Sequence, residues 1–143
     1  MPSMHSSVII PFRSTDNVDT LNWALDGFAR QELASNHTME VFVGIDGGNI
    51  ELRLQGLQPD RFKFVVFPPT GAAGVRNALA KMTSTRTNRL IFANADTRPF
   101  SDMVQQHCDA GGLLAQNSLV LGNASDLRVM RRYHPRNVNT LFQ

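Results

Sequence analysis

Cysteine is almost absent from the sequence, because Cys108 is the only one among 143 residues. An internal disulfide is therefore excluded, and a thiolate zinc site would need ligands that the chain lacks. No apolar run approaches the roughly 20 residues that span a bilayer. The start, MPSMHSS, has neither the basic nor the apolar region of a signal peptide. These absences predict a cytoplasmic protein with no intrinsic membrane anchor.

The sequence also lacks a large excess of positive or negative charge, since the formal net charge is only +2. The basic excess is confined to a tail from about residue 128, RVMRRYHPRNVNTLFQ, which we interpret as a solvated or disordered terminus. Histidines are too scattered for a local metal pair, and no Gly-x-Ser-x-Gly motif occurs. Trp23 and the phenylalanines follow strand and helix periods, which indicates core packing, so we expect no nucleic-acid partner.

What is present is an ordinary globular composition, with 42% apolar and 18% charged residues. This is far from the composition of a disordered chain. The length fits one core, and we predict a single domain over residues 1–143.

Apolar segments with strand and helix periods alternate along the chain. Strands are predicted at 7–11, 39–46, 61–67, 88–93 and 119–121. Helices are predicted with apolar stripes at 18–29, 75–82 and 102–110, and a weaker one at 50–57. We expect Thr15 or Asp16 to cap the first helix, Ser101 to cap the last, and Gly111-Gly112 to end it. Pro11 is expected to end the first strand.

This order predicts an α/β fold, with a mostly parallel central sheet and helices on both faces. Ligands of such sheets bind outside the carboxyl ends of the strands. The rule selects four loops, at 11–15, 46–48, 68–74 and 94–99.

Two aspartates stand at the ends of predicted strands. Asp46 precedes Gly47-Gly48, where it can accept hydrogen bonds from a base or ribose, or simply form a turn. Asp96 follows the strand at 88–93 and is either an Asx-type turn residue or a ligand that shares Mg²⁺ or Mn²⁺ with a diphosphate.

A glycine-containing segment, Gly71-Ala-Ala-Gly-Val-Arg-Asn77, opens a predicted helix. The backbone N–H groups at such a start are candidates for binding an anion. Arg76 and Asn77 are expected in the first turn, where either contacts a pyrophosphate or fixes the loop. The segment matches neither the phosphate-loop nor the dinucleotide motif.

These pieces together resemble the family 2 glycosyltransferases of the GT-A fold. Ser-Val-Ile-Ile-Pro at 7–11 is similar to the family's first strand, and Val-Gly-Ile-Asp-Gly-Gly to its Asp-Asp-Gly-Ser segment. The helix start at 71–78 is similar to Gly-x-x-x-Ala-Arg-Asn-x-Ala, with Val75 in place of Ala. Asn94-Ala-Asp96 falls at the metal-binding Asp-x-Asp, with Asn94 in place of one carboxylate.

The resemblance implies a Rossmann-like, donor-binding N-terminal half of a hexosyltransferase-like enzyme. It would bind a nucleoside-diphosphate sugar, most simply a UDP-sugar, for inverting transfer to an acceptor hydroxyl. We assign nucleotide binding to Pro11, Arg13, Asp46, Arg76 and Asn94. Asp96 would bind Mn²⁺ or Mg²⁺, and the acceptor is left unassigned.

A catalytic base is also left unassigned. The acids after Asp96 are Asp102, Asp109 and Asp126, and none lies in a recognised base motif. The chain is too short after Asp96 for an acceptor-binding half, so truncation, a partner chain or a homo-oligomer, and loss of turnover stay open. A non-catalytic nucleotide-sugar-binding module is the main alternative. A nucleotidyltransferase would show a basic glycine-rich loop after its first strand, whereas Pro11-Phe12-Arg13-Ser14 contains no glycine.

Overall fold

A computed structural model describes residues 3–50 and 61–112 of the chain. Its elements run in the order β1 Met4–Arg13, α1 Val18–Ala29, β2 His37–Asp46, β3 Phe62–Phe67, α2 Ala72–Met82, β4 Arg89–Phe92 and α3 Met103–Gly112. The predicted segments at 51–57 and 119–121, the basic tail from 128 and Asp126 lie outside the described residues. The remaining strands and helices occur where the apolar periods predict them.

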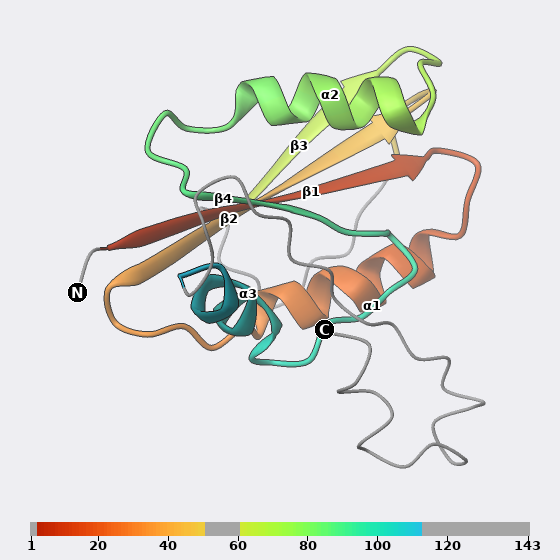
Figure 1. Ribbon diagram of the computed structural model, residues 1–143. Helices are drawn as coiled ribbons and strands as arrows, with labels where there is room; N and C mark the ends of the chain where they lie inside the picture. The colour runs from red at the N-terminus through yellow and green to blue at the C-terminus, as the bar shows by residue number, and fades with distance from the viewer. Residues whose placement is uncertain (1–2, 51–60, 113–143) are drawn as a thin grey trace. The chain divides into compact units, whose positions relative to one another are not determined.

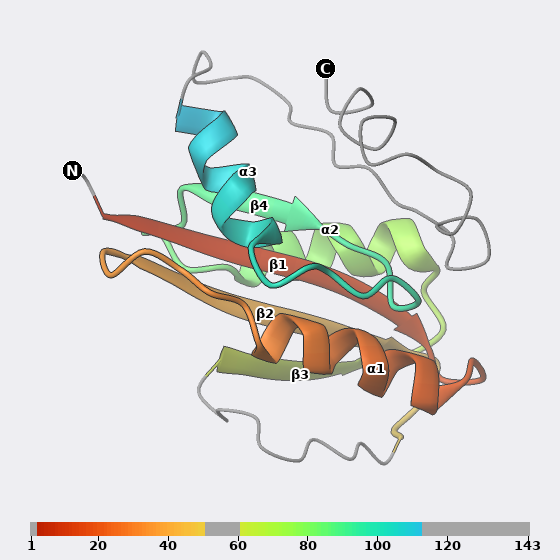
Figure 2. The same cartoon turned by 90° about the horizontal axis from the view of Figure 1, so that it is seen from below.

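The four strands form one parallel sheet in the order β3-β2-β1-β4. The chain builds outward from β1 to β2 and β3, then returns to the other side of β1 to form β4 (Figure 1). Because parallel crossovers are right-handed, this reversal places α1 and α2 on opposite faces of the sheet. Figure 2 shows α1 in front of the strands and α2 behind them. The predicted α/β architecture is confirmed.

The face of the sheet under α2 is packed by a cluster of Ile9, Phe42, Val75 and Leu79. Gly44 lies within this face, and a Cβ there would stand 2.3 Å from Cγ1 of Val75 and 2.9 Å from Cδ1 of Leu79. The missing side chain therefore allows α2 to approach the sheet closely.

The opposite face carries α1, whose buried side chains include Leu21, Leu25 and Phe28. Strand side chains alternate between faces, so the fully buried Val8 and Ile10 face the α1 side. Nη1 of Arg61 donates to the carbonyls of Phe28, at 3.4 Å, and Ala29, at 3.2 Å. A cation is thereby placed at the carboxyl end of α1, where the helix dipole favours it. Burial lowers the pKa of Arg61.

The predicted end of the first strand at Pro11 is wrong. The strand continues through Pro11 to Arg13. The carbonyl of Ile9 accepts from Ala93 on the β4 side, and Pro11 faces the same side because strand groups alternate. The last residue of β4 paired with β1 is Phe92, opposite Ile9, so the missing N–H of Pro11 breaks no ladder bond.

The cap of α1 is Asn17 rather than Thr15 or Asp16. Asn17 has extended backbone angles, φ −72° and ψ 114°, and its Oδ1 accepts from the backbone N–H of Asp19 at 2.9 Å. The backbone N–H of Asp16 instead closes a turn to the carbonyl of Arg13 at 2.9 Å. The capping side chain is therefore the one whose backbone is still extended when the helix begins.

Two further predictions need correction. The helix α3 includes Gly111 and Gly112, whereas the prediction ended it before them, and this is tolerable because each glycine costs only about 1 kcal/mol in a helix. Core packing of all aromatics is also wrong, since Trp23 is 41% exposed and Phe64, Phe92 and Phe100 are 37–67% exposed. Periodicity places a side chain on a face, but exposure depends on what covers that face.

The chain divides into two compact units, Met1–Gln105 and Gln106–Gln143. The first contains the whole sheet with α1 and α2. Of the second, the structure describes only the remainder of α3, so a single domain over the chain stays a prediction. Among the described residues, no helix has the length and apolarity to cross a membrane.

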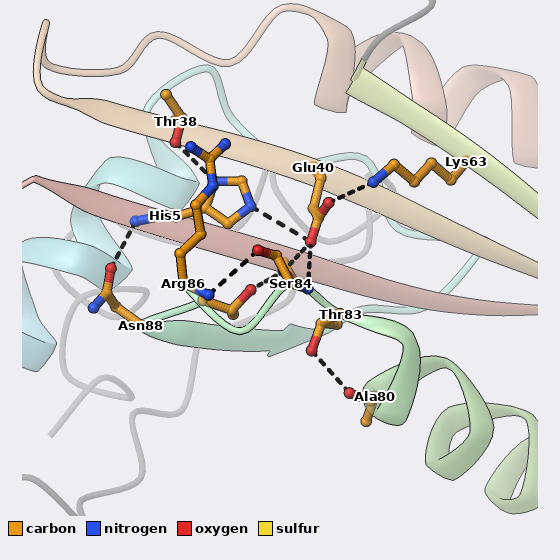
Figure 3. A network of polar contacts seen from close by, with 11 residues as sticks. His5, Thr38, Glu40, Lys63, Ala80, Thr83, Ser84, Arg86 and Asn88 are labelled. Carbon is orange, nitrogen blue, oxygen red and sulfur yellow. Dashed lines mark hydrogen bonds and ion pairs between the residues drawn. The ribbon is translucent and has the colours of Figure 1, made fainter.

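A network of polar side chains fills the amino-terminal end of the sheet (Figure 3). Its centre is Glu40, 5% exposed, which accepts from Oγ of Ser7 at 2.7 Å, Nζ of Lys63 at 2.9 Å and the N–H of Ser84 at 3.4 Å. Nε2 of His5 lies 3.4 Å from the Glu40 carboxylate without forming a hydrogen bond. Burial alone would raise the pKa of Glu40, but these donors outweigh it and lower the pKa to about 2.

Candidate functional site

An open depression of about 510 Å³ lies at the carboxyl end of the sheet. The end of β1 lines it with Pro11 and Phe12, and the segment after β4 lines it with Asn94, Ala95 and Asp96. The turn before α1 and the first turn of that helix add Asp16, Asn17 and Thr20. The lining is therefore mainly oxygen-bearing side chains.

Topology explains why a depression forms here. The connection from β1 runs toward β2 on one side, whereas the segment after β4 follows a strand on the other side of β1. Loops on either side of such a switch point diverge, which leaves a crevice outside the carboxyl ends of the strands. The depression occupies that position between β1 and β4.

The segment that carries Asp96 is held to α1 by Arg98. Nη1 of Arg98 donates to the carbonyl of Trp23 at 2.7 Å, and Nη2 to Oδ2 of Asp26 at 2.8 Å. The guanidinium also lies 5.9 Å from the centre of the Trp23 ring. A hydrogen bond from Arg30, and a second from Arg98, lower the pKa of Asp26.

Close packing supports the same attachment. A Cβ on Gly27 would stand 2.8 Å from Cγ of Arg98 and 2.8 Å from Cδ of Pro99. Because the segment rests against the backbone of α1 at this glycine, Asp96 is anchored although its carboxylate is exposed. Among the described residues, that carboxylate has one long contact, in which it accepts from the hydroxyl of Thr97 at 3.4 Å.

Asn94 and Arg76 connect the depression to α2. Nη2 of Arg76 donates to Oδ1 of Asn94 at 3.4 Å. Arg76 is the fifth residue of α2, so it lies one turn deeper in the helix than predicted. The contact brings a predicted phosphate-binding cation to the rim of the depression.

Asp46 is at the same edge of the sheet but not among the residues that line the depression. Its Oδ1 accepts from the N–H of Thr70 at 2.7 Å, and its Oδ2 from the N–H of Gly71 at 2.9 Å. The carboxylate thereby fixes the loop between β3 and α2 and places a negative charge at the amino end of that helix. The backbone N–H groups of Thr70 and Gly71 are thus already used within the protein.

Arg13 does not line the depression but contacts Asp16, which does. The two side chains form an exposed ion pair, with Nη2 of Arg13 3.3 Å from Oδ1 of Asp16. An exposed pair of this kind contributes at most about 1 kcal/mol and exchanges readily. A ligand in the depression can therefore compete for either partner.

Of the six predicted site residues, Pro11, Asn94 and Asp96 line the depression together. Arg13 and Arg76 each contact a lining residue, whereas Asp46 belongs to a neighbouring loop contact. Sequence reasoning treated Asp16 only as a cap and assigned no role to Asn17 or Thr20. The available signal was the run of polar residues directly after the first strand, in a loop already selected as a ligand loop.

The charges of the lining decide which ligands fit. Asp16 and Asp96 are carboxylates, and no lysine or arginine lines the depression in the described ranges. These carboxylates would repel a diphosphate unless a cation lay between them and the phosphate groups. The donors present are carboxylate and amide oxygens, which are the ligands that Mg²⁺ and Mn²⁺ accept alongside phosphate oxygens.

This oxygen set is not a complete metal cage. Within residues 3–50 and 61–112, no group of three or more His, Cys, Asp or Glu side chains could hold a metal ion. One or two protein carboxylates suffice when substrate phosphates supply further ligands. The lining therefore fits a dication that arrives with a diphosphate, and not a permanently bound structural metal.

No protein-family model matches the sequence, and no curated protein sequence matches it. Solved structures show a similar fold. A crystal structure of S. aureus TarS superposes with a TM-score of 0.59 at 19% identity, over 76% of this chain and 20% of that one. A crystal structure of S. aureus TarS 1-349 in complex with UDP gives 0.58 at 18% identity, over 76% of this chain and 32% of that one.

The chain thus spans about a fifth of the length of the longer TarS chain and about a third of the shorter one. Identity at this level shows a shared fold. The parallel α/β sheet found here is therefore similar to part of the fold of TarS, and one of the TarS structures is a complex with UDP.

Proposed function

We propose that this chain is the nucleotide-sugar-binding part of a glycosyltransferase of the GT-A type, similar to family 2, that uses a UDP-sugar. The observation that carries the proposal is the depression between β1 and β4, where Pro11, Asn94 and Asp96 come together. Support comes from the fold, which is similar to that of TarS, a glycosyltransferase with one UDP complex.

In this proposal the nucleotide lies along the carboxyl edge of the sheet. Asp46 and the depression stand on either side of β1, and strand axes two apart are separated by about 10 Å. A nucleoside diphosphate is long enough to cover that span. A carboxylate has about four acceptor positions, so Asp46 can accept from the base or ribose while it holds Thr70 and Gly71.

The metal site of the proposal is Asp96, with Asn94 beside it. The exposed carboxylate of Asp96 has no cationic partner among the described residues, so it is available to Mn²⁺ or Mg²⁺. A bound dication would neutralise charge on the departing nucleoside diphosphate. The protein residues position the diphosphate, while Arg98 keeps the Asp96 segment in place.

Inverting transfer requires a base that removes the proton of the acceptor hydroxyl. Asp102 and Asp109 follow Asp96 in the described part of the chain, and neither lines the depression. The base and the acceptor site of the proposed enzyme therefore stay unassigned.

The test is calorimetric binding of UDP to the full chain, with and without Mn²⁺. We expect Mn²⁺ to strengthen binding about tenfold or more, because it adds charge-assisted contacts to the diphosphate. Asp96→Asn should remove that gain. Asp19→Asn, which changes an exposed aspartate of α1 outside the lining, is the matched control and should keep it. Equal affinity with and without metal would contradict the role of Asp96.

A non-catalytic nucleotide-sugar-binding module is the second candidate. It is favoured by the absence of any acid after Asp96 from the described lining. Hydrolysis or transfer of sugar from a UDP-sugar by the full chain would support the enzyme. Binding of UDP without any turnover would support the module.

A further inference from the structure

The cation at the rim of the depression, Arg76, is held by a neutral partner. Several basic side chains near the sheet and α1 form ion pairs with carboxylates, namely Arg13 with Asp16, Arg98 with Asp26 and Lys63 with Glu40. Arg76 instead donates to the amide oxygen of Asn94. In the part of the chain that the structure describes, no carboxylate forms an ion pair with Arg76.

This difference changes the charge that a ligand meets. An arginine paired with a carboxylate presents almost no net charge, whereas an arginine held by a neutral amide keeps its full positive charge. The 3.4 Å contact is also long, so it orients the guanidinium without holding it strongly. A guanidinium has five N–H donors, and this contact uses one of them.

The position of Arg76 also favours contact with a ligand in the depression. Asn94 lines the depression and Arg76 contacts Asn94, so the guanidinium stands next to a cavity whose own lining carries Asp16 and Asp96. A diphosphate there needs compensation from a cation. The described residues offer it from Arg76 at the rim, in addition to any metal held by Asp96.

We propose that Arg76, positioned but not neutralised by Asn94, binds the diphosphate directly, so that the chain holds a nucleoside diphosphate even without metal. This inference rests on the proposed function and assigns part of the charge neutralisation to the protein. Asn94 is a positioning residue in it. An aspartate at 94 would add a carboxylate near the metal and at the same time pair with Arg76.

The experiment measures UDP affinity by calorimetry in EDTA and in Mn²⁺ for the full chain and three variants. Wild-type protein should bind UDP in EDTA, and Arg76→Gln should weaken that binding about tenfold, as expected for a lost contact between charged groups. Asn94→Asp should also weaken binding in EDTA and should enlarge the gain produced by Mn²⁺. Lys81→Gln removes an exposed charge from the last turn of the same helix and should change neither value.

The outcomes separate the two proposals. If wild-type protein binds UDP in Mn²⁺ but not in EDTA, or if Arg76→Gln binds as wild type in EDTA, the role of Arg76 is wrong while the proposed function stands. If no UDP binds under either condition, the proposed function is wrong and this inference with it. Thermal unfolding followed by circular dichroism identifies any variant that fails to fold, and Asn94→Asp then tests the charge argument independently of Arg76→Gln.

Discussion

The carboxylates at the two ends of the sheet, Glu40 and Asp96, have opposite environments. At the amino-terminal end, Glu40 is buried and accepts from Ser7, Lys63 and Ser84. At the carboxyl-terminal end, Asp96 is exposed and has one long contact to its neighbour Thr97. A carboxylate surrounded by donors stabilises the fold and is closed to ligands, while one without them costs the fold little and can bind a cation.

The comparison teaches where to look for function in this sheet. Both ends contain acids, polar side chains and loops, so composition does not distinguish them. The depression lies where strand order reverses, at the carboxyl ends. The donor count of each acid then separates the structural carboxylate from the one available to a ligand.

The strongest test of this comparison removes one acid from each end. We expect Glu40→Ala to lower the free energy of unfolding by about 3 kcal/mol, because it leaves buried donors without their acceptor. Asp96→Ala, the counterpart, should change it by less than about 0.5 kcal/mol. Urea unfolding of both variants gives the two values, and similar losses would remove the distinction between the ends.

Lowering the pH should also change the contributions of the two ends to the free energy of unfolding by different amounts. The pKa of Glu40 is lowered from 4.5 to about 2 in the folded protein, so its contribution to stability is fully present above pH 4.5. It is lost as the pH falls toward 2, by up to about 3 kcal/mol.

Unfolding free energies measured across this pH range provide the test. Glu40→Gln should lack this part of the decline, whereas Asp96→Asn should retain it. Parallel curves for wild type and Glu40→Gln would show that other groups cause the loss.

Asp46 is an intermediate case, because it lies at the carboxyl end of the sheet yet is bonded like a structural acid. Asp46→Ala should lower the free energy of unfolding by about 2 kcal/mol, since two backbone N–H groups lose their acceptor. Asp46→Asn should cost roughly half of that, because its amide offers only one oxygen. Hydrogen exchange at Thr70 and Gly71 reports the local effect, and unchanged exchange in Asp46→Ala would contradict the anchoring role.

Much of the fold follows from the sequence because its two central strands, β1 and β2, are buried on both faces. Apolar runs at β1, β2 and β4 and the glycine before α2 predicted their elements directly. The predictions were wrong where a segment distant in the sequence determines the local structure. Pro11 stays within β1 because β4 has already ended beside it, and no local pattern shows where another strand ends.

The site was predictable only in part. The motif that contains Asn94 and Asp96 located the segment after β4, and the strand-end rule placed it at the correct edge. Asp16 and Asn17 were missed as lining residues because their place depends on how α1 leaves β1. The Glu40 network was also missed, although a charge inside each of two apolar strands, Glu40 and Lys63, was a visible signal. Their pairing depends on strand register, which the sequence does not state.

Gly44 connects the interior of the protein with its proposed chemistry. It lets α2 rest against the sheet where any side chain would collide with Val75, and Arg76 is the next residue along that helix. The close approach of α2 to the sheet at this one glycine therefore helps to place the guanidinium beside Asn94. A single methyl group at Gly44 would therefore shift the guanidinium that we propose binds the diphosphate.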